Sequence, residues 1–164
     1  RGSGSVGVAD SARAFLATLS LEQFSTDDPV RFRRRLDEAT SRLRDHLPPP
    51  ANSWGLARKC VNVFLRDAFY NYYLRTAFGL DLAEALYEVP LDNVVATALK
   101  REGRPGQLPQ WNGLRHLTAP MSDRFQGFAS ELAAKRETAR VHLDAILWTL
   151  NRSQRGVRPS TLSF

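Results

Sequence analysis

Residues 54–74 read WGLARKCVNVFLRDAFYNYYL, a stretch in which apolar and aromatic side chains recur at helical spacing. Asn52 or Ser53 precedes this stretch as a helix N-cap, and Gly79 follows it as a residue suited to end a helix. The aromatic side chains cover too much of the circumference for a helix that lies on the surface. The sequence therefore predicts one long helix that extends to about Phe78 and is central to the fold.

The rest of the chain also has the period of amphipathic helices, and no segment has the alternation or the hairpin turns of β-strands. A loop rich in Gly, Pro and Gln is expected over residues 102–113. The sequence predicts an all-α fold, a single compact bundle of six or seven helices. Beside the central helix, the expected helices span about 9–20, 28–47, 81–88, 91–100, 122–136 and 138–152.

The length of 164 residues is that of one globular domain, which we assign to residues 6–152. Residues 153–164 contain Gly, Pro, Ser and Thr without periodicity, and we expect a mobile tail there. Residues 1–5, Arg-Gly-Ser-Gly-Ser, are typical of a remnant of an expression tag. One domain large enough to bury its own core is therefore expected.

Composition narrows the classes of protein. The single cysteine, Cys60, cannot form an internal disulfide or a cysteine-built zinc site, and it favours a reducing, cytoplasmic location. No apolar run approaches the length of a membrane span, and no signal peptide is recognisable, so we expect no membrane partner. No histidine has metal-ligand spacing to another His or Cys, and we expect neither a metal nor a cofactor.

The charge balance points to an anionic partner. Lys and Arg number 23 against 17 Asp and Glu, a net charge of +6, and nucleic acid is the first partner that such a surplus suggests. Only three of the basic residues are lysines. A general bias of composition toward arginine explains the surplus equally well, so the charge alone does not identify the partner.

Lys59 is a rare residue type in this chain and lies inside the aromatic central helix. Burial of a lysine penalises its charged form, and a neutral amine is the nucleophile that Schiff-base chemistry requires. A lysine in such a helix can also extend to solvent and have no chemical role. The residue is thus either a candidate nucleophile or an ordinary surface lysine.

Asp92 follows a proline in EVPLDNVVATAL, residues 88–99, and lies at the start of a predicted helix. A carboxylate there interacts favourably with the helix dipole and caps the first turn. The proline fixes the direction of the chain here, so the carboxylate is also a candidate for a chemical role. Both readings stay open for this residue.

Residues 142–148 read HLDAILW and place Asp144 and Trp148 four positions apart, on one face of a helix. An indole that stacks on a base and a carboxylate that accepts hydrogen bonds from its edge are typical of sites that hold a flipped nucleotide. A core tryptophan beside a solvated aspartate is the alternative. His142 faces another direction and is expected to have a structural role.

Together, the lysine-bearing helix, the Pro-Leu-Asp helix start and the terminal His-Leu-Asp-x-x-x-Trp segment resemble the helix-hairpin-helix DNA glycosylases, most closely the archaeal 8-oxoguanine glycosylases. The resemblance covers about residues 54–148. It implies a DNA-repair enzyme that removes an oxidised purine from damaged duplex DNA, with or without AP-lyase activity. It also implies a nucleoid-associated location.

The resemblance implies a role for several residues of this chain. Lys59 is implied as the nucleophile and Asp92 as the carboxylate that activates it. The implied base-binding residues are Phe64, Asp144 and Trp148, and the implied DNA-backbone contacts are Arg58, Arg66, Arg101 and Arg104.

The register of the central helix leaves one alternative. In the family an aromatic residue lies four positions after the lysine, whereas Phe64 lies four positions after Cys60 and five after Lys59. One residue turns a helix by about 100°. If Cys60 occupies the nucleophile position, the chain binds DNA without cleaving a glycosidic bond. The other classes of function are a non-catalytic nucleic-acid-binding module and a helical interaction protein.

Overall fold

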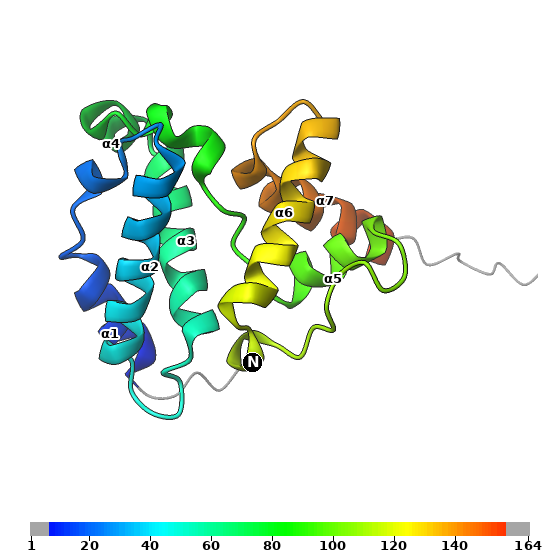
Figure 1. Cartoon of the computed structure of the whole chain (residues 1–164), viewed down its shortest axis with the longest axis horizontal. Helices are drawn as coiled ribbons and strands as arrows, with labels where there is room; N and C mark the ends of the chain where they lie inside the picture. Colours follow the sequence, from blue (N-terminus) through cyan, green and yellow to red (C-terminus); the bar gives the residue numbers. More distant parts are fainter. Residues whose placement is uncertain (1–6, 157–164) are drawn as a thin grey trace, which may run out of the picture.

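The chain folds as an all-helical protein (Figure 1), as its periodicity predicts. The computed structural model describes the backbone of residues 7–156 and the side chains through Thr149, and no strand forms within that range. The α-helices are α1 (Val8–Leu16), α2 (Pro29–His46), α3 (Trp54–Tyr70), α4 (Tyr72–Phe78), α5 (Asn93–Glu102), α6 (Ala119–Lys135) and α7 (Leu143–Gly156). Short 3₁₀ helices are η1 (Leu21–Phe24), η2 (Leu80–Leu86), η3 (Leu114–His116) and η4 (Arg140–His142).

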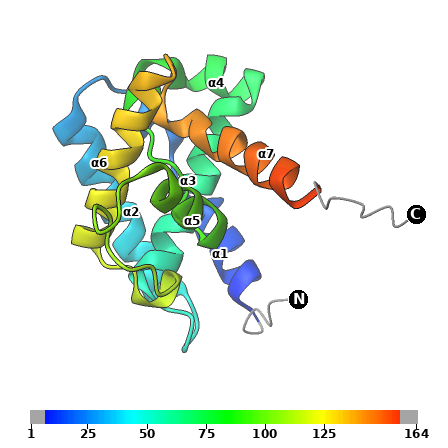
Figure 2. The ribbon, with the colours of Figure 1, turned by 90° about the vertical axis from the view of Figure 1, so that its right-hand side faces the viewer.

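Two hydrophobic clusters, rather than one, form the core. The first joins α1, α2 and α3 to η1 and η2, and the second joins α5, α6 and α7. Figure 1 shows α1 to α4 on the left and α5 to α7 on the right. Seen from that right-hand side, in Figure 2, α5 lies in front of α3. The helices therefore form two packed halves that meet along α3.

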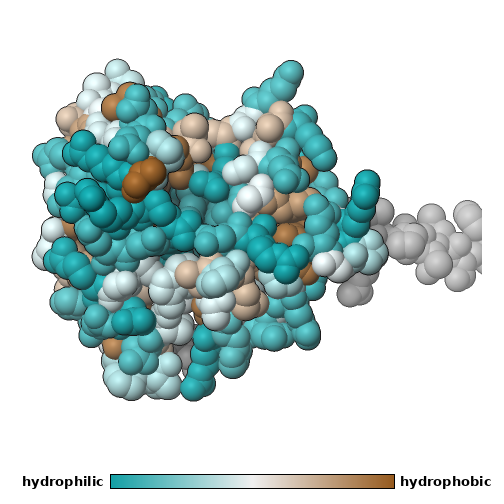
Figure 3. All heavy atoms as spheres, viewed as in Figure 1, coloured by the Kyte–Doolittle hydropathy of each residue, from teal (hydrophilic) through white to brown (hydrophobic). Residues whose placement is uncertain are grey.

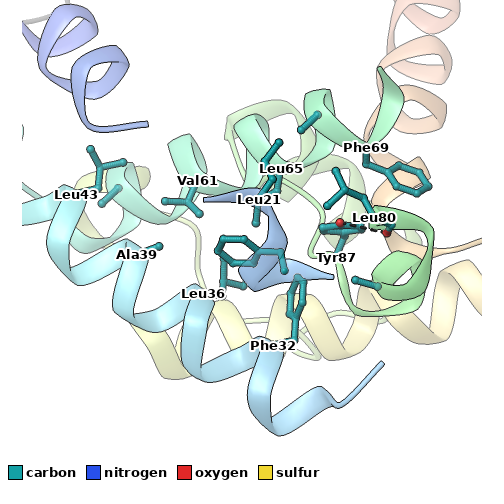
Figure 4. Packing of buried hydrophobic residues seen from close by; sticks show 14 of the residues in the cluster. Leu21, Phe32, Leu36, Ala39, Leu43, Val61, Leu65, Phe69, Leu80 and Tyr87 are labelled. Carbon is teal, nitrogen blue, oxygen red and sulfur yellow. Dashed lines mark hydrogen bonds between the residues drawn. The ribbon is translucent and has the colours of Figure 1, made fainter. Parts of the chain in front are cut away.

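The first cluster is built where α2 and α3 pack side by side. Figure 4 shows Leu36 of α2 and Val61 and Leu65 of α3 in one layer, and all three side chains are buried. Tyr87 closes the end of this layer, and its ring packs against Phe69 at a centroid distance of 5.3 Å. Its hydroxyl donates to a backbone carbonyl of η2, so the one polar atom of this side chain is satisfied.

The single long helix predicted to Phe78 is wrong, because the chain breaks at Asn71. Asn71 has an extended ψ of 112°, and its side-chain oxygen accepts a hydrogen bond from Leu74 N at 3.1 Å. The residue thereby ends α3 and caps α4, as asparagine does when its side chain replaces a helical backbone partner. Tyr72 and Tyr73, which follow the break directly, are therefore outside the core, and Tyr73 is 80% exposed.

The last predicted helix, over residues 138–152, also differs in its bounds. Residues 140–142 form η4, and α7 begins at Leu143 and continues to Gly156, past the end predicted at 152. The first four residues of the predicted tail are thus helical. Residues 1–6 and 157–164, which include the predicted tag remnant and the rest of the tail, lie outside the described residues.

An extended segment, residues 87–91, connects the two halves and is held by side chains rather than by a regular element. Gln126 of α6 pairs with both backbone groups of Val89, accepting from its N–H at 3.1 Å and donating to its carbonyl at 2.8 Å. Arg140 donates to the carbonyls of Leu86 and Tyr87. The direction in which the chain begins α5 is therefore fixed.

Arg58 joins this segment to α3 and is buried, with only 2% of its side chain exposed. Its Nε and Nη2 donate to the Glu88 carboxylate at 2.9 and 3.2 Å, and its Nη1 donates to Asp37 and Thr40 of α2. The expectation that Arg58 contacts the DNA backbone is wrong, because all three of its nitrogens are occupied inside the protein. The sequence does not show which carboxylates a long cationic side chain on a helix face will contact.

Arg58→Met should lower the free energy of unfolding by about 3–5 kcal/mol, because Glu88 would remain buried without its cation. Arg34→Met on the exposed face of α2 is the matched control and should change the free energy by less than about 0.5 kcal/mol. Urea unfolding followed by circular dichroism measures both values. Equal losses in the two variants would contradict a structural role specific to Arg58.

Candidate functional site

A small cavity lies where α3, the start of α5 and α7 meet. It has a volume of about 260 Å³, and four residues that the sequence singled out line it: Lys59, Asp92, Asp144 and Trp148. The other lining residues are Val63, Arg66 and Pro90. Residues far apart in sequence thus converge on one site.

Lys59 and Asp92 form an ion pair across this cavity. The distance from Lys59 Nζ to Asp92 Oδ2 is 3.3 Å, and the two side chains are 30% and 19% exposed. The other carboxylate oxygen of Asp92, Oδ1, accepts hydrogen bonds from the backbone N–H of Val94 and Val95, each at 2.9 Å. Asp92 is therefore both the N-cap of α5 and the partner of the lysine, so the two readings of this residue hold together.

The register of α3 is decided by which side chains line the cavity. Lys59, Val63 and Arg66 do so, at the spacing of one helix face. Cys60 and Phe64 instead pack against the first hydrophobic cluster. The expectation that Phe64 binds a base is wrong, because the one-residue offset turns its ring toward the core. Lys59, and not Cys60, lies in the cavity.

Asp144 is the second carboxylate of the cavity and is buried, with an exposed fraction of 7%. Its Oδ2 accepts a hydrogen bond from Nη1 of Arg66, and Arg66 also donates to its neighbour Asp67. Arg66 was expected to hold a DNA phosphate. Instead, Arg66 lines the cavity and is paired with two carboxylates. Its position seven residues after Lys59 is the only sequence signal that indicates this pairing.

Trp148 lies one helical turn after Asp144 on α7 and is 43% exposed, so its ring is accessible at the cavity. Arg101 and Arg104 do not line this cavity. Arg101 lies in the last turn of α5, not in the loop, whereas Arg104 lies in the loop that follows, and both are exposed. Their contact with a DNA backbone stays a prediction.

His142 has a structural place beside the site and does not line the cavity. Its Nδ1 lies 3.0 Å from the hydroxyl of Tyr70, its Nε2 lies 2.9 Å from a carboxylate oxygen of Glu84, and its ring stacks on Tyr70. Burial raises the pKa of Tyr70 above its ordinary value. These contacts fix the start of α7, and thereby the position of Asp144, against α3.

Comparison of the chain with family models, with curated proteins and with solved structures finds no match. Within residues 7–156, no helix combines the length and the apolar composition that crossing a membrane requires. The same part of the chain contains no group of three His, Cys, Asp or Glu side chains arranged to hold a metal ion.

The double role of Asp92 predicts that two substitutions of this residue change the free energy of unfolding by different amounts. Asp92→Ala should lower the free energy of unfolding by about 1 kcal/mol, because α5 loses its cap. Asp92→Asn should stay within about 0.5 kcal/mol of the wild type, because asparagine caps as well and the partly exposed ion pair contributes little. Thermal and urea unfolding measure both; an equal loss in the two variants would assign the effect to the ion pair instead.

The environment of Cys60 predicts a thiol that reacts slowly with alkylating reagents. Burial raises the pKa of Cys60, and the neighbouring Lys59 ammonium lowers it in part. A raised pKa leaves less thiolate at a given pH, so alkylation by iodoacetamide at pH 7.5 should be slower in the folded protein than in urea. Mass spectrometry follows the reaction, and equal rates would show that the thiol is accessible and unperturbed.

Proposed function

We propose that the protein is a DNA base-excision glycosylase that removes an oxidised purine resembling 8-oxoguanine and cleaves the resulting site through a Schiff base on Lys59. The observation that carries this proposal is the pairing of Lys59 with Asp92 inside a cavity that Asp144 and Trp148 also line. An amine, a carboxylate that can take its proton, a buried acceptor and an accessible indole are the groups that this chemistry needs.

Lys59 supplies the nucleophile in the proposed reaction. Asp92 Oδ2, at 3.3 Å from Nζ, first accepts a proton from the Lys59 ammonium. The lone pair of Nζ then forms a bond to C1′ of the sugar as the bond from C1′ to the base breaks, and the base leaves with that electron pair and takes up the proton that the attacking nitrogen loses.

The steps that follow use the same two groups. The lone pair of the same nitrogen then forms a second bond to C1′ as the bond from C1′ to the ring oxygen breaks; the oxygen takes up the proton held by Asp92, and an iminium between Nζ and C1′ remains. Loss of a proton from C2′ then breaks the bond between C3′ and the phosphate oxygen, which leaves with its electron pair. Hydrolysis of the imine returns Lys59. Its position beside a capped, fixed carboxylate suits it to both the attack and the release.

Asp144 and Trp148 are suited to hold the base. A flipped base can stack on the exposed indole of Trp148 while an N–H on its edge donates to the Asp144 carboxylate. The volume of about 260 Å³ is below the roughly 300 Å³ at which pockets for drug-sized ligands begin. The cavity thus suits one small heterocycle rather than a larger ligand.

A second candidate is a nucleic-acid-binding module without catalysis. The hydrogen bonds that Asp92 accepts from Val94 and Val95 favour this candidate, because they give the carboxylate a sufficient structural role as a cap. In this candidate Lys59 only forms an ion pair with the capping carboxylate and has no chemical role. The two candidates differ in whether a covalent adduct forms.

Borohydride trapping tests the proposal directly. The wild-type chain should form a covalent adduct with duplex DNA that contains 8-oxoguanine, and Lys59→Gln should form none. Asp92→Asn, which keeps the cap, should slow base release by at least about a hundredfold, the effect of losing a general base. Cys60→Ser is the matched control and should trap as the wild type does.

The products separate the candidates. Base release without an adduct would show that the protein is a glycosylase in which water is the nucleophile. It would reject the Schiff base on Lys59. If the chain forms no adduct and releases no base from any damaged duplex, but binds DNA with an affinity that falls steeply with salt, it is the binding module. Absence of DNA binding at low salt would reject both candidates.

A further inference from the structure

The exposed apolar side chains gather in one region, around α4. Of the seven large hydrophobic residues that are exposed among the described side chains, five lie between positions 70 and 82, and α4 has no buried residue. We call four of these the tyrosine face: Tyr70, Tyr72, Tyr73 and Leu74. Tyr72 and Tyr73 are 65% and 80% exposed and pack edge to face. Nothing in the proposed chemistry uses these aromatic residues.

A groove adjoins the tyrosine face. It has a volume of about 750 Å³ and lies between η2 and the C-terminal end of α6 with η4, where Figure 3 shows a notch at the top of the molecule. Leu82, the fifth exposed residue, lines the groove, and so does His142, whose ring stacks on Tyr70. The apolar lining also includes Ala85, Ala133, Ala134 and Ala139. The groove therefore meets the tyrosine face at Tyr70.

The charges along this surface are acidic, although the whole chain carries +6. Asp81, Glu84 and Glu137 line the groove. Its cation Arg140 is occupied by backbone carbonyls, and Asp81 is paired with Arg75 of α4 at 3.4 Å, so the acidic character comes from Glu137 and from Glu84, which contacts His142. A nucleic acid placed here would bring its phosphates against carboxylates, whereas basic side chains would meet them favourably.

We propose that the groove and the tyrosine face are the docking site for a segment of a partner protein that carries apolar anchors flanked by Lys or Arg. Tyrosine is enriched among the residues that contribute most to protein interfaces, because it buries a large ring with little loss of conformational freedom. The acidic rim selects a basic segment. No residue lines both this groove and the cavity of Lys59, so the two sites can be occupied at the same time.

Selection from a random peptide display library on the immobilised full chain tests the proposal, with sheared duplex DNA present as a competitor. The enriched peptides should combine aromatic or aliphatic anchors with Lys or Arg. Their affinity should fall by about tenfold or more in a double variant, Tyr72→Ser with Tyr73→Ser, and also in Leu82→Ser. Glu137→Gln should weaken binding several-fold, and this difference should shrink at high salt.

Val30→Ser is the matched control, because Val30 is 77% exposed on α2 but does not line the groove, and its loss should leave peptide affinity unchanged. Circular dichroism should show the same helix content in all variants. Enrichment of no peptide, or of acidic peptides, would overturn the proposal. So would loss of DNA affinity in the double variant, which would mark a nucleic-acid surface, or loss of self-association, which would mark a contact between two copies.

Discussion

The ion pair between Arg58 and Glu88 fixes how the two halves of the molecule meet. Arg58 belongs to α3 in the first half, and Glu88 belongs to the segment that leads into the second. Both side chains are almost fully buried, so each charge depends on the other. Because Gln126 and Arg140 hold the backbone of the same segment, its path is set by side chains from both halves.

The candidate site follows from this arrangement, because the pairing is repeated one residue further along α3. Arg58 pairs with Glu88, and Lys59 pairs with Asp92, which lies four positions after Glu88. The inner pair is buried and structural, whereas the outer pair is partly exposed and lines a cavity. Asp92 keeps its orientation through the cap of α5, so the amine meets a carboxylate whose direction does not depend on a ligand.

The aromatic residues of the segment 54–78 divide between two uses. Phe69 on the inner face of α3 belongs to the core, whereas Tyr70, Tyr72 and Tyr73 are on the tyrosine face, and Phe78 packs against the first cluster again. The break at Asn71 places Tyr72 and Tyr73 outside the core, because it turns the chain away before the aromatic run ends. An acidic, apolar surface thus lies beside a site proposed to bind an anionic polymer, and the two surfaces suit different partners.

The sequence by itself determined the helical class and the approximate course of most helices, because periodicity and capping are local, and it singled out Lys59, Asp92, Asp144 and Trp148 as candidates. That these four residues meet in one cavity is decided by the packing of α3, α5 and α7. Only the tertiary structure decided that Arg58 is buried, that Phe64 faces the core and that Arg66 pairs with Asp144. Each of these outcomes depends on which distant carboxylate or helix packs against one face of α3. Local patterns carry no information about that choice, since a helix with residues suited to burial on several sides can be packed in more than one direction.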